Sequence, residues 1–378
     1  MKIGILTFHH VDNYGATLQA YALWNFLNSQ GYDVEIIDYR PLKIAWIYFR
    51  PLLPIKRVKF SINESKKEIK KIRFNEKYLI YISRAWKMRR FLLSNIKLSN
   101  RTVYDKKALK YYHDKYDLIV CGSDQIWCLD SFRGYNSSFF LDFVNNKTTR
   151  KISYAASFGN TIKLGNYHKE ISTLINQFQS ISVRDSNSLK IISNECNKEA
   201  VKVLDPTFLI KYDALKSLPK TQDEYLLLYI QADIEPEEEN FIKLLAKEKN
   251  LTIISVGKYN PLAQINLEAA SPKEWIGLYS QASYIVTNTY HGAVFSIIFK
   301  KLFNVFVPND KSNKVTDLLN DLGLANRIFS DKLKSQILNN QIFDIDYEAV
   351  SEILESKIIE SKNYLVEAIL QGVVDNRT

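Results

Sequence analysis

The chain has 378 residues, enough for about two or three domains and for a hydrophobic core that needs no disulfide or metal. Hydrophobic residues make up 46% and charged residues 24%, as in folded globular proteins, and the 12 glycines and 9 prolines exclude a collagen-like chain. No apolar run is long enough to predict a membrane-spanning helix, and the N-terminal MKIGILTF is too short and strand-like for a signal peptide. We therefore expect a cytoplasmic protein.

Metal and disulfide chemistry are not supported by the pattern of cysteines and histidines. Cys121, Cys128 and Cys196 form no CxxC pair, and apart from His291 the histidines do not pair at the spacing of metal ligands. We expect neither a bound metal nor a resident cofactor.

The positive charge is concentrated in one segment. The whole chain has a net charge of +10, whereas residues 40–115 contain 22 basic and 5 acidic residues, a net of +17. Aromatic residues such as Trp46, Tyr81 and Trp86 are interleaved with the basic ones. This mixture is typical of a surface on anionic lipid, of a nucleic-acid groove, or of a helical insertion with solvated lysines. We expect a helical insertion, with peripheral contact to the inner face of the plasma membrane as the main functional alternative and nucleic-acid binding as the least favoured.

The N-terminal half has the pattern of alternating strands and helices. Residues 3–8 form a short apolar run typical of a strand, a turn follows at residues 13–15, and residues 16–28 have helical apolar spacing. This order predicts a doubly wound parallel sheet. Further strands are predicted at 33–38, 118–121, 151–155 and 180–183, with a helix near 167–178.

A second α/β series begins after Leu204-Asp205-Pro206, which we interpret as a domain boundary. Strands are predicted at 225–230, 251–256, 284–286 and 303–307, and helices at 236–248, 272–281 and 291–301. Residues 346–369 again have helical spacing.

These patterns predict an α/β protein of GT-B-like architecture, in which two doubly wound Rossmann-like domains face each other across a cleft. We place the N-terminal domain at 1–205, with the basic helical insertion at about 40–115, and the C-terminal domain at 206–345. A helix in 346–378 is expected to pack back on the N-terminal domain. Ligands of open α/β sheets bind at the carboxyl ends of strands, so motifs that directly follow strands are candidates for the site.

Two such motifs lie in the N-terminal domain. Asn13-Tyr14-Gly15 joins a strand to a helix, where free amide groups attract anions, although an ordinary turn with glycine relieving strain is an equal interpretation. In GSDQIW, Ser123 and Asp124 can hydrogen-bond a sugar or phosphate and Trp127 can stack on a sugar. A helix-capping Asp124 with Trp127 in the core is the slightly favoured alternative.

Three further candidates carry charge. Arg184 directly follows a predicted strand, and its planar guanidinium suits a carboxylate or phosphate, with a salt bridge to Asp185 or a helix cap as the alternative. His291 starts a helix in the motif Asn288-Thr289-Tyr290-His291-Gly292, where hydroxyls, an amide and an imidazole converge, which favours function over simple capping. Lys311 lies on the loop after the next strand and could reach the same cleft, although by itself it is a surface lysine.

The motifs NYGATLQAYAL, CGSDQIW, SYAASFG, SVRDSNS, LDPTF and TNTYHGAVFSIIFKK occur in this order. Together they resemble the polysaccharide pyruvyl transferase family from residue 3 to about residue 312, apart from the basic insertion. Tyr290, where leucine or phenylalanine is common, and the long insertion depart from the family pattern.

The resemblance implies a GT-B-like fold and phosphoenolpyruvate as a co-substrate, with the acceptor on the N-terminal domain and the donor phosphate on the C-terminal one. It implies transfer of pyruvate as a ketal to a sugar, typically in lipid-linked precursors of capsule, exopolysaccharide or other cell-envelope polymers. By the same resemblance, Arg184 binds the donor, His291 is catalytic and Lys311 binds phosphate. Asp124 is then a candidate for a base that orients a sugar hydroxyl.

Other classes of function remain open at this stage. A nucleotide-sugar glycosyltransferase of the same fold would need a ribose-binding glutamate, for which Glu268 and Glu274 are candidates. A non-catalytic basic protein that binds membrane or nucleic acid, or a relative with a different acceptor, would also fit the composition. Neither the acceptor sugar nor the oligomeric state follows from the sequence.

Overall fold

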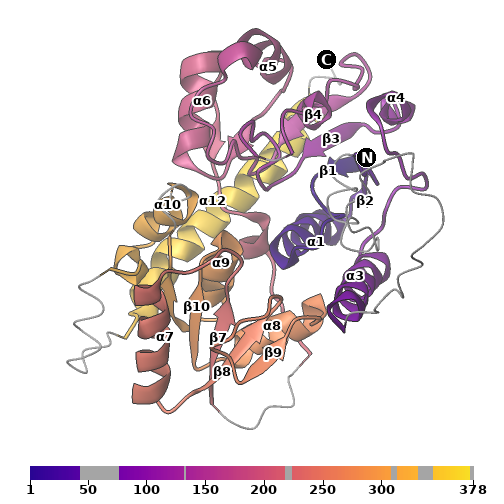
Figure 1. The fold of residues 1–378 in the computed structure, drawn as a ribbon. Coiled ribbons are helices and arrows are strands. Elements are labelled where there is room, and N and C mark those ends of the chain that lie inside the picture. The colour runs from indigo at the N-terminus through magenta and orange to yellow at the C-terminus, as the bar shows by residue number, and fades with distance from the viewer. Residues whose placement is uncertain (43–75, 132, 218–223, 308–312, 331–343, 375–378) are drawn as a thin grey trace, which may run out of the picture.

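The computed structural model describes residues 1–42, 76–131, 133–217, 224–307, 313–330 and 344–374. These residues form two α/β units, one above the other in the view of Figure 1, and the long C-terminal helix α12 (Tyr347–Val374) runs along both. The expected α/β architecture with parallel sheets is therefore confirmed.

The N-terminal unit contains a four-stranded parallel sheet with the strand order β2-β1-β3-β4. Almost every side chain of the four strands is buried, including Lys151 and Ser153 of β4, because a parallel sheet is covered on both faces. The strands are β1 (Lys2–Leu6), β2 (Asp33–Ile36), β3 (Leu118–Cys121) and β4 (Arg150–Ser153). A short parallel pair, β5 (Ser182–Val183) and β6 (Val201–Lys202), continues this edge through isolated bridges from β4 and the residues after it.

Helices cover the N-terminal sheet and connect its strands. Helix α1 is buried over most of its length because it lies between the two units, and Asn13 caps it by accepting a hydrogen bond from the amide of Ala16 at 3.0 Å. The other helices are α3 (Glu76–Asn95), α4 (Lys106–Leu109), α5 (His168–Ile175) and α6 (Ser186–Cys196), with α1 itself at Tyr14–Ser29.

The C-terminal unit has a five-stranded parallel sheet with the order β11-β10-β7-β8-β9. Pro236 and Pro272 stand in the first turns of α7 and α8, where a missing amide hydrogen costs nothing, and both helices begin with capping boxes. The strands are β7 (Tyr225–Tyr229), β8 (Thr252–Val256), β9 (Ile265–Leu267), β10 (Tyr284–Thr287) and β11 (Leu302–Val305). The helices are α7 (Pro236–Glu248), α8 (Pro272–Gln281), α9 (Tyr290–Ile298) and α10 (Asn313–Asp321). Strand β9 and helix α10 had no counterpart among the sequence-based elements.

Helix α12 ties the two units together. At its N-terminal end, the Tyr347 hydroxyl donates to the carbonyl of Lys301, and near its C-terminal end Arg150 donates to the carbonyls of Ala368 and Ile369 at 2.8 and 2.9 Å. In its middle, the Ser361 hydroxyl accepts from the Leu204 amide at 3.0 Å. The helix therefore contacts both units.

The basic segment is only partly described, because residues 43–75 lie outside the described ranges. Its helix α3 connects the units through Arg84, which pairs with Asp12 of the N-terminal unit and donates to the carbonyl of Gly257 in the C-terminal one. Lys87 adds an ion pair with Glu274 at 3.1 Å. Within the described residues, no helix combines the length and the apolar character needed to cross a membrane.

Candidate active site

A cavity of about 210 Å³ opens between the two units at the carboxyl ends of their strands. This is the position at which ligands of open α/β sheets bind. Six of the predicted residues line it together: Asn13, Asp124, Arg184, Asn288, Thr289 and His291. Gln125, Arg133, Tyr229, Gln231, Tyr290, Phe306, Val307, Lys314 and Val315 complete the lining.

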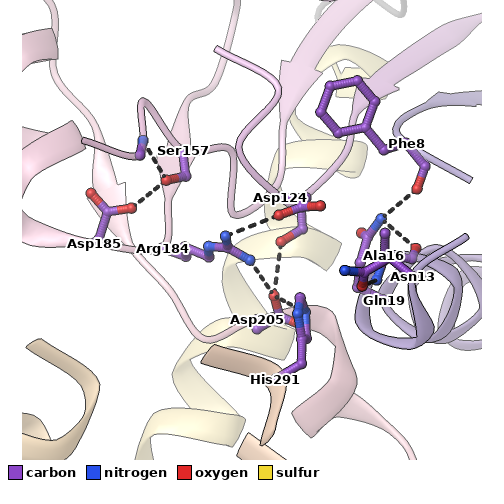
Figure 2. Close-up of polar contacts among 12 residues, drawn as sticks. Phe8, Asn13, Ala16, Gln19, Asp124, Ser157, Arg184, Asp185, Asp205 and His291 are labelled. Atoms are coloured by element: carbon purple, nitrogen blue, oxygen red, sulfur yellow. Dashed lines mark hydrogen bonds and ion pairs between the residues drawn. The ribbon is translucent and has the colours of Figure 1, made fainter. Parts of the chain in front are cut away.

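Arg184 is held in the cavity wall by two carboxylates. The next residue, Asp185, caps helix α6 by accepting from the Ser188 amide at 2.8 Å, so it is not the partner of Arg184. Instead, the guanidinium donates to Asp205 at 2.9 Å and to Asp124 at 3.2 Å (Figure 2), and it lies 4.4 Å from the centre of the Tyr290 ring. These contacts orient a cation that is almost completely buried.

Asp205 is the centre of this network, although the sequence placed it at a domain boundary and in the LDPTF motif and not among the site residues. Its Oδ2 atom accepts hydrogen bonds from Arg184 and, at 3.1 Å, from the Ser123 hydroxyl, while Oδ1 accepts from the amide and hydroxyl of Thr207. Burial alone would raise the pKa of Asp205, but His291 and then Arg184 hold that pKa well below its usual range. Asp205 is therefore a carboxylate that keeps its charge and can stabilise a protonated His291.

His291 lies in the first turn of helix α9, facing the N-terminal unit. Thr289 caps the helix by accepting from the Gly292 amide at 3.0 Å. The imidazole Nε2 lies 3.5 Å from Asp205 Oδ2, the ion pair drawn in Figure 2. This contact is too long for a good hydrogen bond, and within the described residues the buried Nε2 makes no hydrogen bond. Because an unpaired buried ring nitrogen is costly, this atom is available to a bound ligand.

Asp124 occupies the far side of Arg184 with an unusual backbone. Its φ of 80° is in the left-handed region, which only a few non-glycine residues adopt. Burial would raise the pKa of Asp124, but Arg184 and then His291 lower it overall. The carboxylate is thus a hydrogen-bond acceptor at neutral pH rather than a strong base.

The lysine that lines the cavity is Lys314, in the first turn of helix α10. Burial, followed by the nearby charge of Arg184, lowers its pKa to about 8, so it is mostly protonated at neutral pH. Lys311, the predicted phosphate ligand, lies outside the described residues. Helix α10 was not predicted from the sequence. The one signal that could have pointed to Lys314 is its position a few residues after strand β11.

The other predicted residues support the site without lining the cavity. Ser123 is fully buried behind Asp205, and Tyr14 donates to the Ala270 carbonyl at 2.7 Å across the domain interface. Gly15 lies against the His291 ring, where a Cβ atom would come within 2.2 Å of Nδ1. A Cβ atom added at Gly292 would come within 2.1 Å of the Thr287 hydroxyl oxygen, so the glycine leaves room for this hydroxyl.

Trp127 is a core residue and not a sugar platform. It is 1% exposed and stacks on Phe140 with ring centres 5.4 Å apart. This agrees with the alternative that the sequence slightly favoured for Trp127. Among the described residues, no group of three His, Cys, Asp or Glu side chains is arranged to hold a metal ion.

Comparisons with known proteins identify both the family and the fold. The family model described as polysaccharide pyruvyl transferase matches residues 13–310. No curated protein sequence matches the chain significantly. The residues that build the cavity wall thus fall almost entirely within the matched range, and Lys314 lies just beyond it.

Solved structures with similar folds have low sequence identity. The chain is similar to the S. aureus MnaA–UDP co-structure (11% identity, TM-score 0.51, covering 98% of this chain and 96% of that one). It is also similar to a putative UDP-N-acetylglucosamine 2-epimerase from Listeria monocytogenes (9%, TM-score 0.51, 98% and 96%). A third similar structure is a mutant O-GlcNAc transferase from Thermobaculum terrenum (11% identity, TM-score 0.50). The match covers 99% of this chain but only 66% of that one. These similarities confirm the expected GT-B-like fold.

Proposed function

Because the chain belongs to the polysaccharide pyruvyl transferase family, we propose that it transfers pyruvate from phosphoenolpyruvate to a sugar of a polysaccharide or lipid-linked precursor. The product is a pyruvate ketal and the released group is phosphate. The observation that carries this proposal is the convergence of Arg184, Lys314 and His291 on one small cavity.

The charges of the cavity fit the donor. Phosphoenolpyruvate carries its carboxylate and its phosphate ester on the same carbon atom, C2, and the cavity offers Arg184 and Lys314 to them. A guanidinium suits the planar carboxylate, and an ammonium is a compact partner for phosphate. A cavity of about 210 Å³ is small compared with ordinary ligand pockets, which agrees with a donor of this size.

The reaction balances with the groups that the site contains. C3 of the donor accepts a proton, which makes C2 electrophilic, and a sugar hydroxyl forms the first C–O bond to C2. The bond from C2 to the phosphate oxygen then breaks, and a second hydroxyl closes the ketal. The two sugar hydroxyls release two protons. One restores the proton that the general acid gave to C3, and the other leaves with phosphate, so no oxidant or reductant is consumed.

His291 is the proposed general acid and Asp205 its positioning residue. The unpaired Nε2 can deliver a proton to C3 or to the departing phosphate, and the charged Asp205 stabilises the imidazolium. Asp124, whose pKa is lowered, orients the attacking hydroxyl by accepting its hydrogen bond. Positioned charges of this kind contribute most where they meet charge that develops in the transition state.

A nucleotide-sugar glycosyltransferase remains the alternative function. The carboxylate of Glu274 is already bonded to the Ser271 amide at 2.6 Å and to Lys87, so nothing in its contacts favours ribose binding. The comparison that distinguishes the two functions is therefore the donor itself.

The test is isothermal titration of the purified protein with phosphoenolpyruvate and, separately, with a panel of UDP-sugars. We expect phosphoenolpyruvate to bind to the wild type and to bind at least tenfold more weakly to Arg184→Lys, which keeps the charge. Arg101→Lys, the same change at an exposed arginine, should retain the affinity of the wild type. Binding of a UDP-sugar instead of phosphoenolpyruvate would refute the proposal.

We also propose that the outer face of helix α3 contacts an anionic membrane surface. Leu79, Ile82, Trp86 and Leu93 are 53, 40, 57 and 58% exposed, and helical spacing places them on one stripe with the exposed Arg89 and Arg90. Apolar and aromatic side chains flanked by arginines are typical of interfacial helices.

Vesicle flotation would test this contact. Binding to vesicles with anionic lipid at low salt is expected, weakened about fivefold for each arginine removed, since each is worth roughly 1 kcal/mol near such a surface. Trp86→Ser should weaken it as well, whereas Tyr259→Ser, which removes an exposed aromatic residue of the other unit, should not. Equal binding to neutral vesicles would contradict the proposed electrostatic contact.

A further inference from the structure

A second cavity adjoins the proposed donor cavity on its N-terminal side. It measures about 110 Å³ and shares two lining residues, Gln125 and Arg133, with the first. Both cavities therefore open onto the same side chains at the carboxyl end of β3. Much of its wall comes from one loop, and Phe8, which follows β1, also lines it. The loop residues are Cys128, Ser131, Arg133, Gly134, Tyr135 and Asn136.

The lining of this second cavity combines flat aromatic surface with hydrogen-bonding groups. Phe8, Tyr135 and Phe139 provide the aromatic part, and Gln125, Ser131 and Asn136 the polar part. Sugars present an apolar ring face and a rim of hydroxyls, which is the pattern that such a lining recognises. None of the described residues that line this cavity is a carboxylate, the group that would favour a cation.

The side chain of Gln125 is placed at the junction by a glycine. Gly159 has a φ of 60°, and a Cβ atom there would lie 3.1 Å from both Cδ and Nε2 of Gln125. Only glycine adopts this backbone readily and leaves space for the amide. Gly159 ends the SYAASFG motif, so two motifs that are far apart in sequence combine to position one amide between the cavities.

A third, small cavity continues the row away from the donor cavity. It shares Phe8 and Pro41 with the second and is lined further by His10 and Arg40. Burial, and then the charge of Arg40, lowers the pKa of His10 to about 3, so this imidazole is neutral at physiological pH. This third cavity measures only about 10 Å³, which is room for about one water molecule, so the second cavity is the one that can hold a sugar.

We propose that the second cavity binds the acceptor sugar as a single pyranosyl residue, with Gln125 and Arg133 binding its hydroxyls at the boundary with the donor cavity, where Asp124 orients the attacking one. This inference rests on the proposed function and names the place of its acceptor.

The test uses saturation-transfer NMR on the protein saturated with phosphoenolpyruvate, with a panel of methyl hexopyranosides and N-acetylhexosaminides as probes. At least one probe should bind to the wild type. Gln125→Ala should weaken that binding at least tenfold, because the amide makes hydrogen bonds of the kind that specify a sugar hydroxyl. Ser131→Tyr should abolish it by filling the cavity, and Ser193→Tyr, the same change at an exposed position of α6, should leave it intact.

The outcomes separate this inference from the function on which it rests. Failure of the wild type to bind phosphoenolpyruvate in the titration above overturns the proposed function. If phosphoenolpyruvate binds but no probe does, or if the bound probe is unaffected by both Gln125→Ala and Ser131→Tyr, the acceptor site is wrong while the donor proposal stands. Thermal melts of each variant show that it is folded before its binding is compared.

Discussion

Replacing Gly15 with alanine should disable the site without unfolding the protein. Gly15 lies in the first turn of α1, which belongs to one unit, and packs against His291 of the other. An added Cβ would meet Nδ1 of His291 at 2.2 Å, whereas ordinary contact begins at 3.4 Å. The imidazole or the helix must therefore move by about 1.2 Å, the difference between these two distances.

The size of the movement sets the size of the effect. A displacement of about 1 Å at a catalytic group costs roughly a hundredfold in rate, and overpacking of this kind costs about 1–3 kcal/mol of stability. We therefore expect pyruvyl transfer by Gly15→Ala to fall about a hundredfold. The melting temperature should fall by only a few degrees, as expected for a chain of this size.

The assay is phosphate release from phosphoenolpyruvate in the presence of a responsive glycoside, with thermal unfolding measured in parallel. Gly31→Ala is the control, because Gly31 has a φ of 82° and no atom within 4 Å of an added Cβ, so it tests backbone strain alone. Near-normal activity in Gly15→Ala would refute the argument that this contact positions His291.

Three further predictions concern charge. Arg184→Ala should lower the free energy of unfolding by about 3 kcal/mol in denaturant titrations, because it removes a buried partner of Asp205; no change would show that the remaining partners suffice. Affinity for phosphoenolpyruvate should fall as the pH rises above about 8, because Lys314 then loses its proton. This pH dependence should vanish in Lys314→Ala and persist in Lys311→Ala. The reverse result would show that Lys311 is the phosphate ligand. Burial would raise the pKa of Asp38, yet hydrogen bonds from His9 and Arg40 hold it well below its ordinary value of 3.8. The Asp38 carboxylate therefore contributes its full stability above about pH 4, and this contribution is lost as the pH falls further. Asp38→Asn should have a lower free energy of unfolding than the wild type at pH 7, and this free energy should fall less between pH 5 and pH 3. An equal fall in the two proteins would contradict this prediction.

The acid titration also tests the structure around the third cavity. Asp38 accepts hydrogen bonds from His9 at 3.0 Å, from both ends of the Arg40 guanidinium, and from the Thr102 hydroxyl at 2.6 Å. These contacts anchor the strand end from which Arg40 and Pro41 reach the cavity. A destabilised Asp38→Asn variant is therefore expected to bind glycosides more weakly as well.

The local sequence was enough to predict most strands and helices and several side chains of the candidate site. Short apolar runs predicted the buried parallel strands. The residues chosen from the polar motifs after these strands line one cavity in the structure: Asp124, Arg184, Asn288, Thr289 and His291. This succeeded because the carboxyl ends of parallel strands meet at one edge of a sheet, so a position just after a strand already fixes the location of its side chain.

Other features were decided only by tertiary packing. Asp205 looked like a linker residue, yet burial between Arg184, Ser123 and His291 makes it the charged centre of the network. Lys314 reaches the cavity because α10 begins just beyond β11, and Gly15 matters because a helix of one unit abuts a helix of the other. Each of these features depends on contacts between residues that are far apart in the chain. The local pattern of apolar and polar residues does not specify which distant side chain will pack against a given residue.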